Sequence, residues 1–418
     1  MKVKSVKMGL LGCAFLFFLY SCEVEQIEPA KPVENENVID SAETEKETID
    51  SSRVEKKDEN IEVIGTGSGK LVIKDVENKN FSIKPGVYGD ILIENTKNTS
   101  IKGDKNVKIV GSTINISNVD NIEIAGITIE NGTKGIYISK SANDLTLKDI
   151  NLKNISTYGI RFDVNKKFDN SPQSYSKNIQ LINIKAENVR VLFESTGGIE
   201  TDGFYGLIKG FKLTGSTIVN SPNLESAVYL NLGEDFEVSN NVVNNVNTNN
   251  NNHNGIFHVK GNGKIFNNKI TNHQGNAVRS WLFSITKPNS LVEIYNNIVY
   301  NSRRYSAFEV QVTPDIKGKV GFKPANAKIY NNTVGKMNTG QPKYYEGRII
   351  DIYQTFGSVE VYNNLYFDMR DNIVSLNQSN PNDTKVKETN NRYFKNANEA
   401  VTDLTAFISK IPGIGAKL

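Results

Sequence analysis

Cysteine and histidine are scarce in this sequence, and long helix-forming runs are almost absent. The 418 residues include two cysteines and three histidines. Cys13 lies in an N-terminal segment that we expect to be removed and Cys22 stands at its end, so the mature domain has no disulfide. The histidines lack the spacing of a zinc site on one element, and no phosphate-binding glycine loop or nucleophile elbow occurs. The domain must therefore be stabilised by the stacking of short strands.

Residues 1–22 are predicted to be a signal peptide. Three lysines precede an apolar run from Met8 to Tyr20, which is too short to span a bilayer comfortably. The run ends in Leu19-Tyr20-Ser21-Cys22, which resembles a bacterial lipobox, where the cysteine receives lipid. We therefore expect a membrane-anchored lipoprotein, lipidated at Cys22 and facing the periplasm or the cell surface. The alternative is an ordinary signal peptide with a chance cysteine.

Residues 23–60 carry thirteen acidic and five basic residues with little apolar content, which predicts a disordered tether. The whole chain has a net charge of +3. Because the signal carries three lysines and the tether is acidic, residues 61–418 carry about +8. A basic domain outside the cytoplasm favours an acidic polysaccharide over nucleic acid as its partner. We expect a monomer that meets the membrane through its lipid anchor only.

One short phrase recurs through the C-terminal half of the chain. It consists of a β-branched residue, one outward residue and an Asn-Asn pair, and the pairs fall 27, 29, 35 and 32 residues apart. A period of roughly 20–50 residues with one strand phrase per repeat indicates a solenoid. The five copies are Val238-Ser239-Asn240-Asn241, Ile265-Phe266-Asn267-Asn268, Ile294-Tyr295-Asn296-Asn297, Ile329-Tyr330-Asn331-Asn332 and Val361-Tyr362-Asn363-Asn364.

The repeat predicts an all-β fold. Short strands without crossover helices build parallel sheets by winding, and the handedness rule for parallel crossovers makes the winding right-handed. We therefore predict one right-handed parallel β-helix of about ten coils over residues 61–418. Inward Val, Ile and Leu should stack into a continuous core. The Asn-Asn pairs fit a corner that needs the αL conformation and hydrogen bonds to the next coil.

A second phrase, upstream of each Asn-Asn pair, places aromatic and ionisable residues outward. If these strands stack about 4.8 Å apart, their outward residues form two columns. An exposed Trp281 is costly unless a partner covers it, and aromatic faces with polar neighbours suit sugar rings. The alternative is a solvated face with cross-strand pairs such as Arg279 with Glu309. The first predicted column contains Tyr137, Arg161, Glu200, Tyr229, His258, Arg279, Glu309 and Asp351. The second contains Ser139, Asp163, Asp202, Asn231, Lys260, Trp281, Gln311 and Tyr353.

The columns contain the groups that β-elimination of a uronic-acid polymer requires. Such cleavage needs a cation beside the carboxylate, a base for the C5 proton and an acid for the departing O4. Lys260 is the candidate base, because His258 and Arg279 would disfavour its charged form. Arg279 is the candidate to neutralise the carboxylate or to assist the leaving oxygen. Tyr229, Tyr353 and His258 are the candidate acids.

Three stretches of the sequence resemble the core of the alginate lyase and chondroitinase B family of polysaccharide lyases. In that family a Lys, an Asn-Asn turn, a Gln-Gly and an Arg occur in this order on a right-handed β-helix. The resemblance covers about twenty to thirty residues and implies that Lys260 is the Brønsted base and Arg279 its catalytic partner. The stretches are His258-Val259-Lys260-Gly261-Asn262-Gly263, Phe266-Asn267-Asn268-Lys269-Ile270 and Gln274-Gly275-Asn276-Ala277-Val278-Arg279.

The sequence also departs from that family. Ser280-Trp281 follow the arginine, where the family usually has His-Gly. The family often uses Ca²⁺ held by an Asn and two acidic residues shortly before the Lys, but residues 247–254 contain no carboxylate. We therefore predict no cofactor and no metal site. A lyase with Ca²⁺, a lyase without metal and a different chemistry all stay open.

Two alternatives to a lyase stay open. Asp163, Glu200 and Asp202 are candidates for the acid and base of a β-helix glycoside hydrolase. The domain is otherwise a non-catalytic solenoid that binds glycans or serves a structural role. In the lyase hypothesis the substrate-binding residues are Glu200, Asp202, Trp281, Arg303, Arg304, Glu309, Arg348 and Tyr353.

Overall fold

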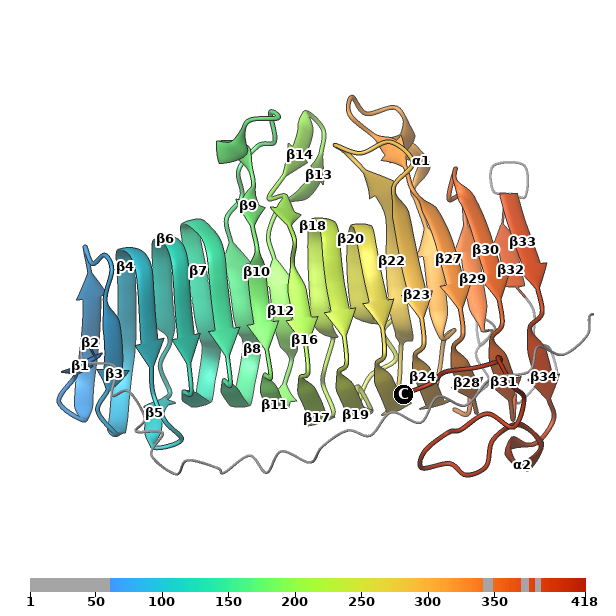
Figure 1. Cartoon of the computed structure of the whole chain (residues 1–418), viewed down its shortest axis with the longest axis horizontal. Helices are drawn as coiled ribbons and strands as arrows, with labels where there is room; N and C mark the ends of the chain where they lie inside the picture. Colours follow the sequence, from blue (N-terminus) through green and yellow to red (C-terminus); the bar gives the residue numbers. More distant parts are fainter. Residues whose placement is uncertain (1–60, 341–348, 370–375, 380–384) are drawn as a thin grey trace, which may run out of the picture. The chain divides into compact units, whose positions relative to one another are not determined.

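The computed structural model describes residues 61–340, 349–369, 376–379 and 385–418. The expected signal peptide, the tether and Cys22 lie outside these residues. The described part consists almost entirely of parallel strands that wind into a right-handed parallel β-helix (Figure 1). On the near face in Figure 1 the strands run downward while the chain advances from left to right. The predicted fold class is confirmed.

Three sheets form the sides of the β-helix, and face A is the one built from the second sequence phrase. Its strands pair in parallel register from Leu71 through Ile160 and Val278 to Leu376. Within the described residues its strands are β2 (Ser68–Lys74), β4 (Gly86–Lys102), β6 (Ile114–Ala125), β7 (Thr128–Lys148), β8 (Asn151–Asp163), β12 (Val191–Ser195), β18 (Ser226–Ser239), β20 (Gly255–Phe266), β22 (Asn276–Ser284), β25 (Phe308–Gln311), β29 (Ile350–Tyr353) and β32 (Leu376–Ser379).

Faces B and C complete each coil after face A, and the longest strands bend round a corner into them. Face B is formed by the ends of β4, β6, β7, β18 and β20 together with β1 (Ile61–Ile64), β3 (Asn80–Ile83), β9 (Ser176–Lys177), β10 (Ile179–Ile182), β15 (Ile208–Lys209), β16 (Lys212–Thr214), β23 (Leu291–Tyr295), β27 (Asn326–Tyr330), β30 (Ser358–Tyr362) and β33 (Lys385–Thr389). Face C is formed by the beginnings of β4, β7 and β8 together with β5 (Val107–Val110), β11 (Lys185–Val189), β17 (Thr217–Ser221), β19 (Val242–Val246), β21 (Lys269–His273), β24 (Ile298–Ser302), β28 (Thr333–Gly335), β31 (Leu365–Phe367) and β34 (Arg392–Phe394).

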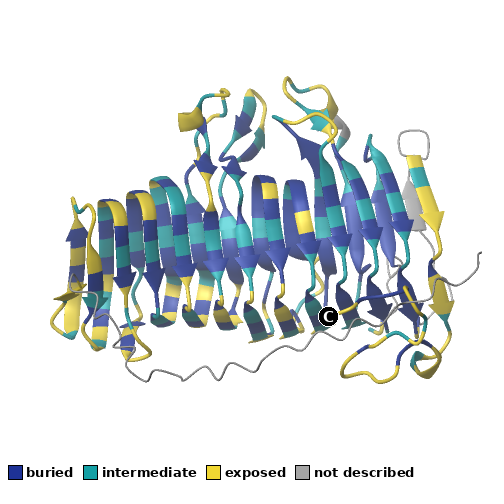
Figure 2. Ribbon diagram, viewed as in Figure 1, coloured by how far each residue is buried: buried dark blue, intermediate teal, exposed yellow. Residues whose placement is uncertain are grey.

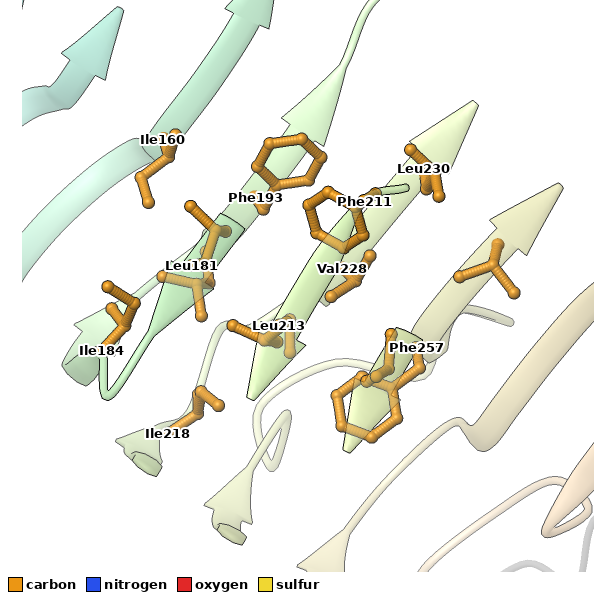
Figure 3. Close-up of a cluster of buried hydrophobic side chains, with 14 of the residues drawn as sticks. Ile160, Leu181, Ile184, Phe193, Phe211, Leu213, Ile218, Val228, Leu230 and Phe257 are labelled. Atoms are coloured by element: carbon orange, nitrogen blue, oxygen red, sulfur yellow. The ribbon is translucent and has the colours of Figure 1, made fainter. Parts of the chain in front are cut away.

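The core of the β-helix follows from the two-residue alternation of its strands. In β7, Ile136 and Ile138 point inward and are buried, whereas Tyr137 between them is half-buried on the outside. Figure 2 shows the same alternation of buried and less buried residues along the strands. Inside, equivalent residues of successive coils stack, as Leu181 does on Leu213. Within one coil, the Phe193 ring from face A meets the Phe211 ring at the start of face B, with ring centroids 4.5 Å apart (Figure 3). Each fully buried side chain of this size stabilises the fold by about 1.5–3 kcal/mol.

The Asn-Asn pairs form the corner between faces B and C. The first asparagine of each pair is in the αL conformation, as at Asn267 and Asn296, both with φ of 56°. The second is buried and bonds its counterpart in the next coil, as in the 2.9 Å bond from Asn268 Nδ2 to Asn297 Oδ1. The predicted role of these pairs is therefore confirmed. The buried asparagine ladder consists of Asn241, Asn268, Asn297, Asn332, Asn364 and Asn391.

Insertions project from the edge where face A passes into face B (Figure 1). They are the segment that contains η1 (Pro172–Ser174), the antiparallel hairpin of β13 (Gly198–Glu200) and β14 (Gly203–Tyr205), and the segment that contains α1 (Pro314–Lys317) and β26 (Lys323–Pro324). A second apolar cluster, outside the β-helix core, holds them together. Its buried members are Phe204, Leu207, Leu232, Phe283 and Ile285.

The end of the chain folds back over face C. The segment after α2 (Ala397–Ala400) is held by two hydrogen bonds. Its Thr405 carbonyl accepts from Lys269 Nζ at 2.8 Å, and its Ala416 N donates to Thr333 Oγ1 at 2.8 Å. Phe407 is buried in a separate apolar cluster on this face. Both α1 and α2 span four residues. In the described part of the chain no helix combines the length and apolar character that a bilayer crossing needs.

Candidate functional site

Face A presents two outward columns of side chains whose order is fixed by the parallel register. Except on β12, the columns contain the residues that the alternation predicted. From β7 to β29, the first column is Tyr137, Arg161, Glu194, Tyr229, His258, Arg279, Glu309 and Asp351. The second column contains Ser139 and Asp163 and continues with Lys260, Trp281, Gln311 and Tyr353.

The prediction was wrong at β12, where it assigned Glu200 and Asp202 to the columns. The strand is Val191–Ser195, and Glu194 is the Cα partner of Arg161. Glu200 and Asp202 instead belong to the hairpin that follows this strand. Gly197, with φ of 88°, turns the chain out of the sheet in a conformation that glycine adopts without strain. These two carboxylates are therefore not on the shared outer wall.

The hairpin residues are occupied by local contacts. Asp202 accepts hydrogen bonds from Lys167 Nζ at 2.6 Å and from the Tyr205 hydroxyl at 2.9 Å. These bonds lower the pKa of Asp202. The carbonyl of Glu200 accepts a bond from Lys319 Nζ at 2.5 Å. The contacts tie the hairpin to the neighbouring insertions.

Lys260 is the central residue of the site. Its Nζ donates to Asn231 Oδ1 at 2.9 Å and lies 5.3 Å from the ring centroid of Tyr229 and 4.7 Å from that of Trp281. Asn231 is itself held by the bond from its backbone N to Ser195 Oγ at 2.9 Å. The ammonium group therefore sits between two aromatic rings on a fixed amide oxygen.

The backbone immediately after Lys260 requires glycine. Gly261 has φ of 134°, and a Cβ there would lie 1.7 Å from the carbonyl oxygen of Gly233. The two strands come this close at a shift in the register between β18 and β20. Gly261 belongs to the stretch that resembles the lyase family, and in this chain its presence is explained by the close packing of the two strands.

The pKa of Lys260 is lowered to about 8, first by burial and then by the positive charge of Arg279. Glu194 acts in the opposite direction. The sequence predicted the direction from Arg279 and His258, but burial is the larger cause. An amine with this pKa is partly neutral near neutral pH, as a general base must be.

Arg279 is fixed by a buried carboxylate. Its Nε lies 2.7 Å from Glu309 Oε1, and the Glu309 side chain is 1% exposed. Its Nη1 donates to the His253 carbonyl at 3.1 Å. The other oxygen of Glu309 lies 2.8 Å from His253 Nε2, and the His253 ring stacks on Tyr305 at 4.3 Å. Glu309 therefore holds both the guanidinium and the loop that carries His253.

Tyr229 and His258 lie side by side on successive strands. Their rings meet edge to face at 4.5 Å. Burial raises the pKa of Tyr229, so its hydroxyl stays protonated. Burial also holds the pKa of His258 well below its usual range, so the imidazole is neutral. In the described structure no hydrogen-bond partner meets His258 Nε2.

Trp281 is half-buried, which corrects the expectation of an exposed ring. It packs against the second apolar cluster beside Phe283 and Phe204. Lys260 lies over its ring. Among the described atoms its Nε1 finds no hydrogen-bond acceptor. The ring is therefore fixed by packing while its polar edge is unused.

Arg303 and Arg304 lie in the loop between β24 and β25. The Arg303 guanidinium donates to the carbonyl of Asn250, and burial lowers its pKa. This bond fixes the loop of residues 247–254 to the loop between β24 and β25. Neither arginine lines the pocket described below.

Tyr353, the last predicted binding residue that the structure describes, lies at the far end of face A. Tyr353 is in the second column, three strands beyond Lys260, and is half-buried. Three strand spacings correspond to about 14 Å, so Tyr353 is remote from the lysine. Arg348 lies outside the described residues.

A pocket of about 390 Å³ opens on face A at Tyr229, His258 and Arg279, and Lys260 itself is not among its lining residues. It extends over five successive strands, β8, β12, β18, β20 and β22, and over the loops that lead into them. A concave site of this size with convergent polar groups suits a small ligand or a segment of a polymer. It is lined by Thr157, Tyr158, Arg190, Val191, Glu194, Glu225, Ser226, Tyr229, Asn252, His253, Asn254, His258 and Arg279.

The residues around Lys260 do not fit a calcium ion. Across the described ranges, no three His, Cys, Asp or Glu side chains gather closely enough to hold a metal. In the loop where the lyase family has acidic ligands, Asn254 Nδ2 instead donates to the Glu225 carbonyl at 2.5 Å, and Asn247 bonds Gln274. Calcium prefers several carboxylate and carbonyl oxygens, which this loop does not direct to one point.

Four residues of the site were not predicted from the sequence, namely Glu194, Arg190, Glu225 and His253. One signal for β12 was available, because the apolar run Val191-Leu192-Phe193 is a better strand than the glycine-flanked segment of residues 199–202. The other three lie in loops that enter face A. Their approach depends on loop conformation, for which the sequence carries no periodic signal.

Comparisons with known proteins find similarity in structure alone. No family model matches the sequence, and no curated protein matches it. A structure titled as a new PL6 alginate lyase in complex with trisaccharide shares 11% identity over 80% of this chain and 81% of that chain, with a TM-score of 0.38. The A-module of the mannuronan C-5 epimerase AlgE4 from Azotobacter vinelandii shares 11% identity over 76% of this chain and 87% of that chain, with a TM-score of 0.33. At these values the two likenesses do not bear on activity.

Proposed function

We propose that this protein cleaves a polysaccharide that contains uronic acid, by β-elimination on face A. The observation that carries the proposal is the setting of Lys260. The lysine is half-buried between Tyr229 and Trp281, its pKa is about 8, and in the described structure its polar partner is the neutral Asn231. A structural lysine on a sheet is normally exposed or paired with a carboxylate. A base with a pKa near the working pH is efficient.

In the proposed reaction the neutral Lys260 Nζ takes the C5 proton of the uronate and becomes an ammonium. The electron pair of the C5–H bond forms the C4–C5 double bond, and the C4–O4 bond breaks. Arg279 stabilises the carboxylate, on which negative charge develops, and Glu309 holds the guanidinium in place. The products are an unsaturated uronate at one new end and a hydroxyl at the other.

Tyr229 is the best-supported donor of the proton that the leaving O4 requires. Its ring centroid lies 5.3 Å from Lys260 Nζ, and its raised pKa keeps the hydroxyl protonated. His258 is neutral because burial depresses its pKa, which makes it a weak acid for this step. Tyr353 is three strands away from the lysine. Of the three predicted acids, Tyr229 alone combines proximity with the required proton.

The hydrolase alternative receives less support from the structure. It needs two carboxylates on opposite sides of a scissile bond, between about 5 and 9.5 Å apart. Asp163 lies on face A and accepts a hydrogen bond from the Tyr137 hydroxyl. Glu200 and Asp202 lie in the hairpin, off the outer wall, and the Asp202 carboxylate is engaged there by Lys167 and Tyr205. The three residues on which this alternative rested are therefore not one site.

The test is the substitution Lys260→Met, with Lys264→Met as its matched control. Lys264 lies on the same strand but on face B, where it is exposed beside Glu293 at 3.4 Å. We expect Lys260→Met to lower kcat by roughly 100- to 10,000-fold, the usual contribution of a general base, and Lys264→Met to leave it unchanged. Activity is measured as the ultraviolet absorbance of the new C=C bond.

Three outcomes of this experiment would exclude a lyase that uses Lys260. They are wild-type activity in Lys260→Met, equal loss in both variants, and new reducing ends without the absorbance. Retained polymer binding by a wild-type protein that yields no product would instead identify a glycan-binding solenoid.

We also propose that the domain acts as a monomer on a lipid anchor at Cys22. The proposal is supported by the apolar run and the lipobox-like Leu19-Tyr20-Ser21-Cys22. A Cys22→Ser variant should move from the membrane fraction to the soluble fraction. An unchanged distribution would contradict lipidation at this residue.

A further inference from the structure

The arginines of face A are neutralised by glutamates of the same face. Arg161 Nη1 lies 2.6 Å from Glu194 Oε1 and Arg279 Nε lies 2.7 Å from Glu309 Oε1. Each pair joins neighbouring strands in the first column. These ion pairs therefore add no net positive charge to the wall, because each guanidinium is compensated at hydrogen-bond distance. In the proposed reaction Arg279 still meets one carboxylate, that of the central uronate.

The pocket lining shows the same balance. Arg190 Nη2 lies 2.6 Å from Glu225 Oε1, and both residues line the pocket with Glu194 and Arg279. The domain has a net charge of about +8 by sequence, but this excess does not lie in the pocket.

Lys260 is the exception among the cations of this wall. In the part of the chain that the structure describes, no carboxylate lies within ion-pair distance of its Nζ, which instead contacts the neutral Asn231. Glu194 acts on Lys260 only through its more distant charge. When Lys260 is protonated, the central part of face A thus offers about one uncompensated positive charge, at one position along the groove. When Lys260 is neutral, as the proposed reaction requires, this charge is absent.

The neighbours of Lys260 along the column are neutral. In its own column Trp281 follows it by one strand and Gln311 follows Trp281. On the preceding strand lie its amide partner Asn231 and, in the first column, Tyr229. Strands are about 4.8 Å apart, close to the length of one sugar unit in an extended chain. A sugar next to the central one would therefore meet an aromatic ring or an amide. A carboxylate placed there would lose water without gaining a cation, which is unfavourable.

We propose that the substrate carries its carboxylates sparsely, with each uronate flanked by neutral sugars. This inference rests on the proposed function and refines its substrate class. A homopolymer of uronate, with one charge on every sugar, would place uncompensated carboxylates beside Tyr229, Trp281 and Glu194. A densely sulfated polymer would do so to a greater degree. An unsulfated polymer in which uronate alternates with a neutral sugar places one carboxylate at the central position, beside Arg279 and Lys260, and neutral rings on either side.

The experiment compares three polymers on the wild-type domain. They are an unsulfated polymer of alternating glucuronate and N-acetylhexosamine, a homopolymer of uronate, and a sulfated polymer of alternating uronate and hexosamine. Cleavage is followed by ultraviolet absorbance at fixed low salt, because salt screens charged contacts. We expect kcat/KM on the alternating unsulfated polymer to be at least about 10-fold higher than on the other two. Equal or faster cleavage of the homopolymer or the sulfated polymer would overturn the inference while leaving the lyase proposal intact.

Binding distinguishes failure of the inference from failure of the proposed function. If no polymer yields an unsaturated product, the lyase proposal fails, and affinity electrophoresis of the wild-type domain on the same polymers decides the inference. Tighter binding to the alternating unsulfated polymer would support it. Tighter binding to the homopolymer or the sulfated polymer, equal binding to all three, or binding to none would overturn it.

A charge variant tests the physical cause. In Glu194→Gln the Arg161 guanidinium loses its partner, so the groove gains one positive charge. We expect the preference, taken as the ratio of kcat/KM on the homopolymer to that on the alternating polymer, to rise about 5-fold. The ratio cancels any effect on the pKa of Lys260. The matched control is Glu237→Gln on face B, which frees Lys212 at 3.1 Å without touching face A. An unchanged ratio in a folded Glu194→Gln variant, or an equal rise in both variants, would overturn the explanation.

Discussion

Face A and face B are formed by the same coils, yet their outward columns differ in what their side chains contact. On face B the rings of Phe266 and Tyr295 stack at 4.9 Å and 1°, and Lys264 meets Glu293 at 3.4 Å in the adjoining column. The same stacking continues through Tyr330 and Tyr362. Face B therefore satisfies its own side chains, strand against strand.

Face A leaves polar groups without such partners. Lys260 is held by an amide and two rings, and in the described structure His258 Nε2 and Trp281 Nε1 have no hydrogen-bond partner. Buried polar atoms of this kind are costly, and the cost is offset where a ligand supplies the missing partners. One scaffold thus carries a closed face and an open face, and the difference lies in a few outward residues.

The largest expected effect among tests of this comparison, after the loss of Lys260, comes from the aromatic hydroxyls. Tyr229→Phe removes the proposed proton donor and should lower kcat by roughly 100-fold or more, the usual contribution of a general acid. Tyr295→Phe makes the same change in the face B ladder and should leave kcat unchanged. Both are measured by ultraviolet absorbance under saturating polymer. A Tyr229→Phe enzyme with normal kcat would show that the proton comes from another group.

The pH dependence of activity should report the titration of the half-buried Lys260 amine on face A. Only neutral Lys260 can accept the proton, and its pKa is about 8. We therefore expect kcat/KM to rise about 10-fold per pH unit below 8 and to level off above it, which gives roughly 50-fold between pH 6 and pH 8. A series of initial rates across this range, with the fold checked by circular dichroism, measures it. A rate that falls as the pH rises would contradict Lys260 as the base.

Breaking the asparagine corner between faces B and C should lower the stability of the whole β-helix. Asn332 is buried, donates to Asn364 Oδ1 at 3.0 Å and accepts from Asn297. Replacing it with alanine leaves buried groups unsatisfied and should lower the free energy of unfolding by about 2–3 kcal/mol. The control Asn331→Gly keeps the αL conformation that Asn331 adopts with φ of 52°. Thermal unfolding compares the two variants, and equal midpoints would show that the buried ladder adds little.

The smallest expected effect is that of metal removal. The donor set around Lys260 does not fit calcium, and Arg279 is placed to stabilise the carboxylate. Treatment with a chelator should therefore change the initial rate by less than about 2-fold. Re-addition of calcium after dialysis serves as the control. A complete loss that calcium restores would contradict the metal-independent mechanism.

The regular part of the fold could be predicted from the sequence because two periodic signals agree. The in–out alternation of the strand phrases placed Lys260, Arg279 and Glu309 on one face, and the parallel register confirms this. The Asn-Asn spacing set the corner of each coil. Both signals depend on local chemistry that repeats once per coil.

The prediction failed where the repeat is interrupted. Between β8 and β18, the prediction placed the strand at the segment with Glu200, whereas the apolar run Val191-Leu192-Phe193 before Glu194 marks the true strand. The loop that brings His253 to Glu309 has no repeat at all. The pairing of Arg190 with Glu225 joins two such loops. Contacts of this kind follow from tertiary packing, which a single sequence does not reveal.

The returning C-terminal segment has a consequence for how the β-helix can change in length. It touches residues that belong to four different coils, at Lys269, Asn296, Thr333 and Asn363. A solenoid normally gains or loses whole repeats with little penalty at distant sites. Here the C-terminal segment contacts each of these coils at a fixed position. Deleting one coil between β21 and β31 would therefore displace the contacts on one side of the deletion by one strand spacing. Changes in coil number should therefore be tolerated toward the N-terminal end and resisted beneath the C-terminal segment.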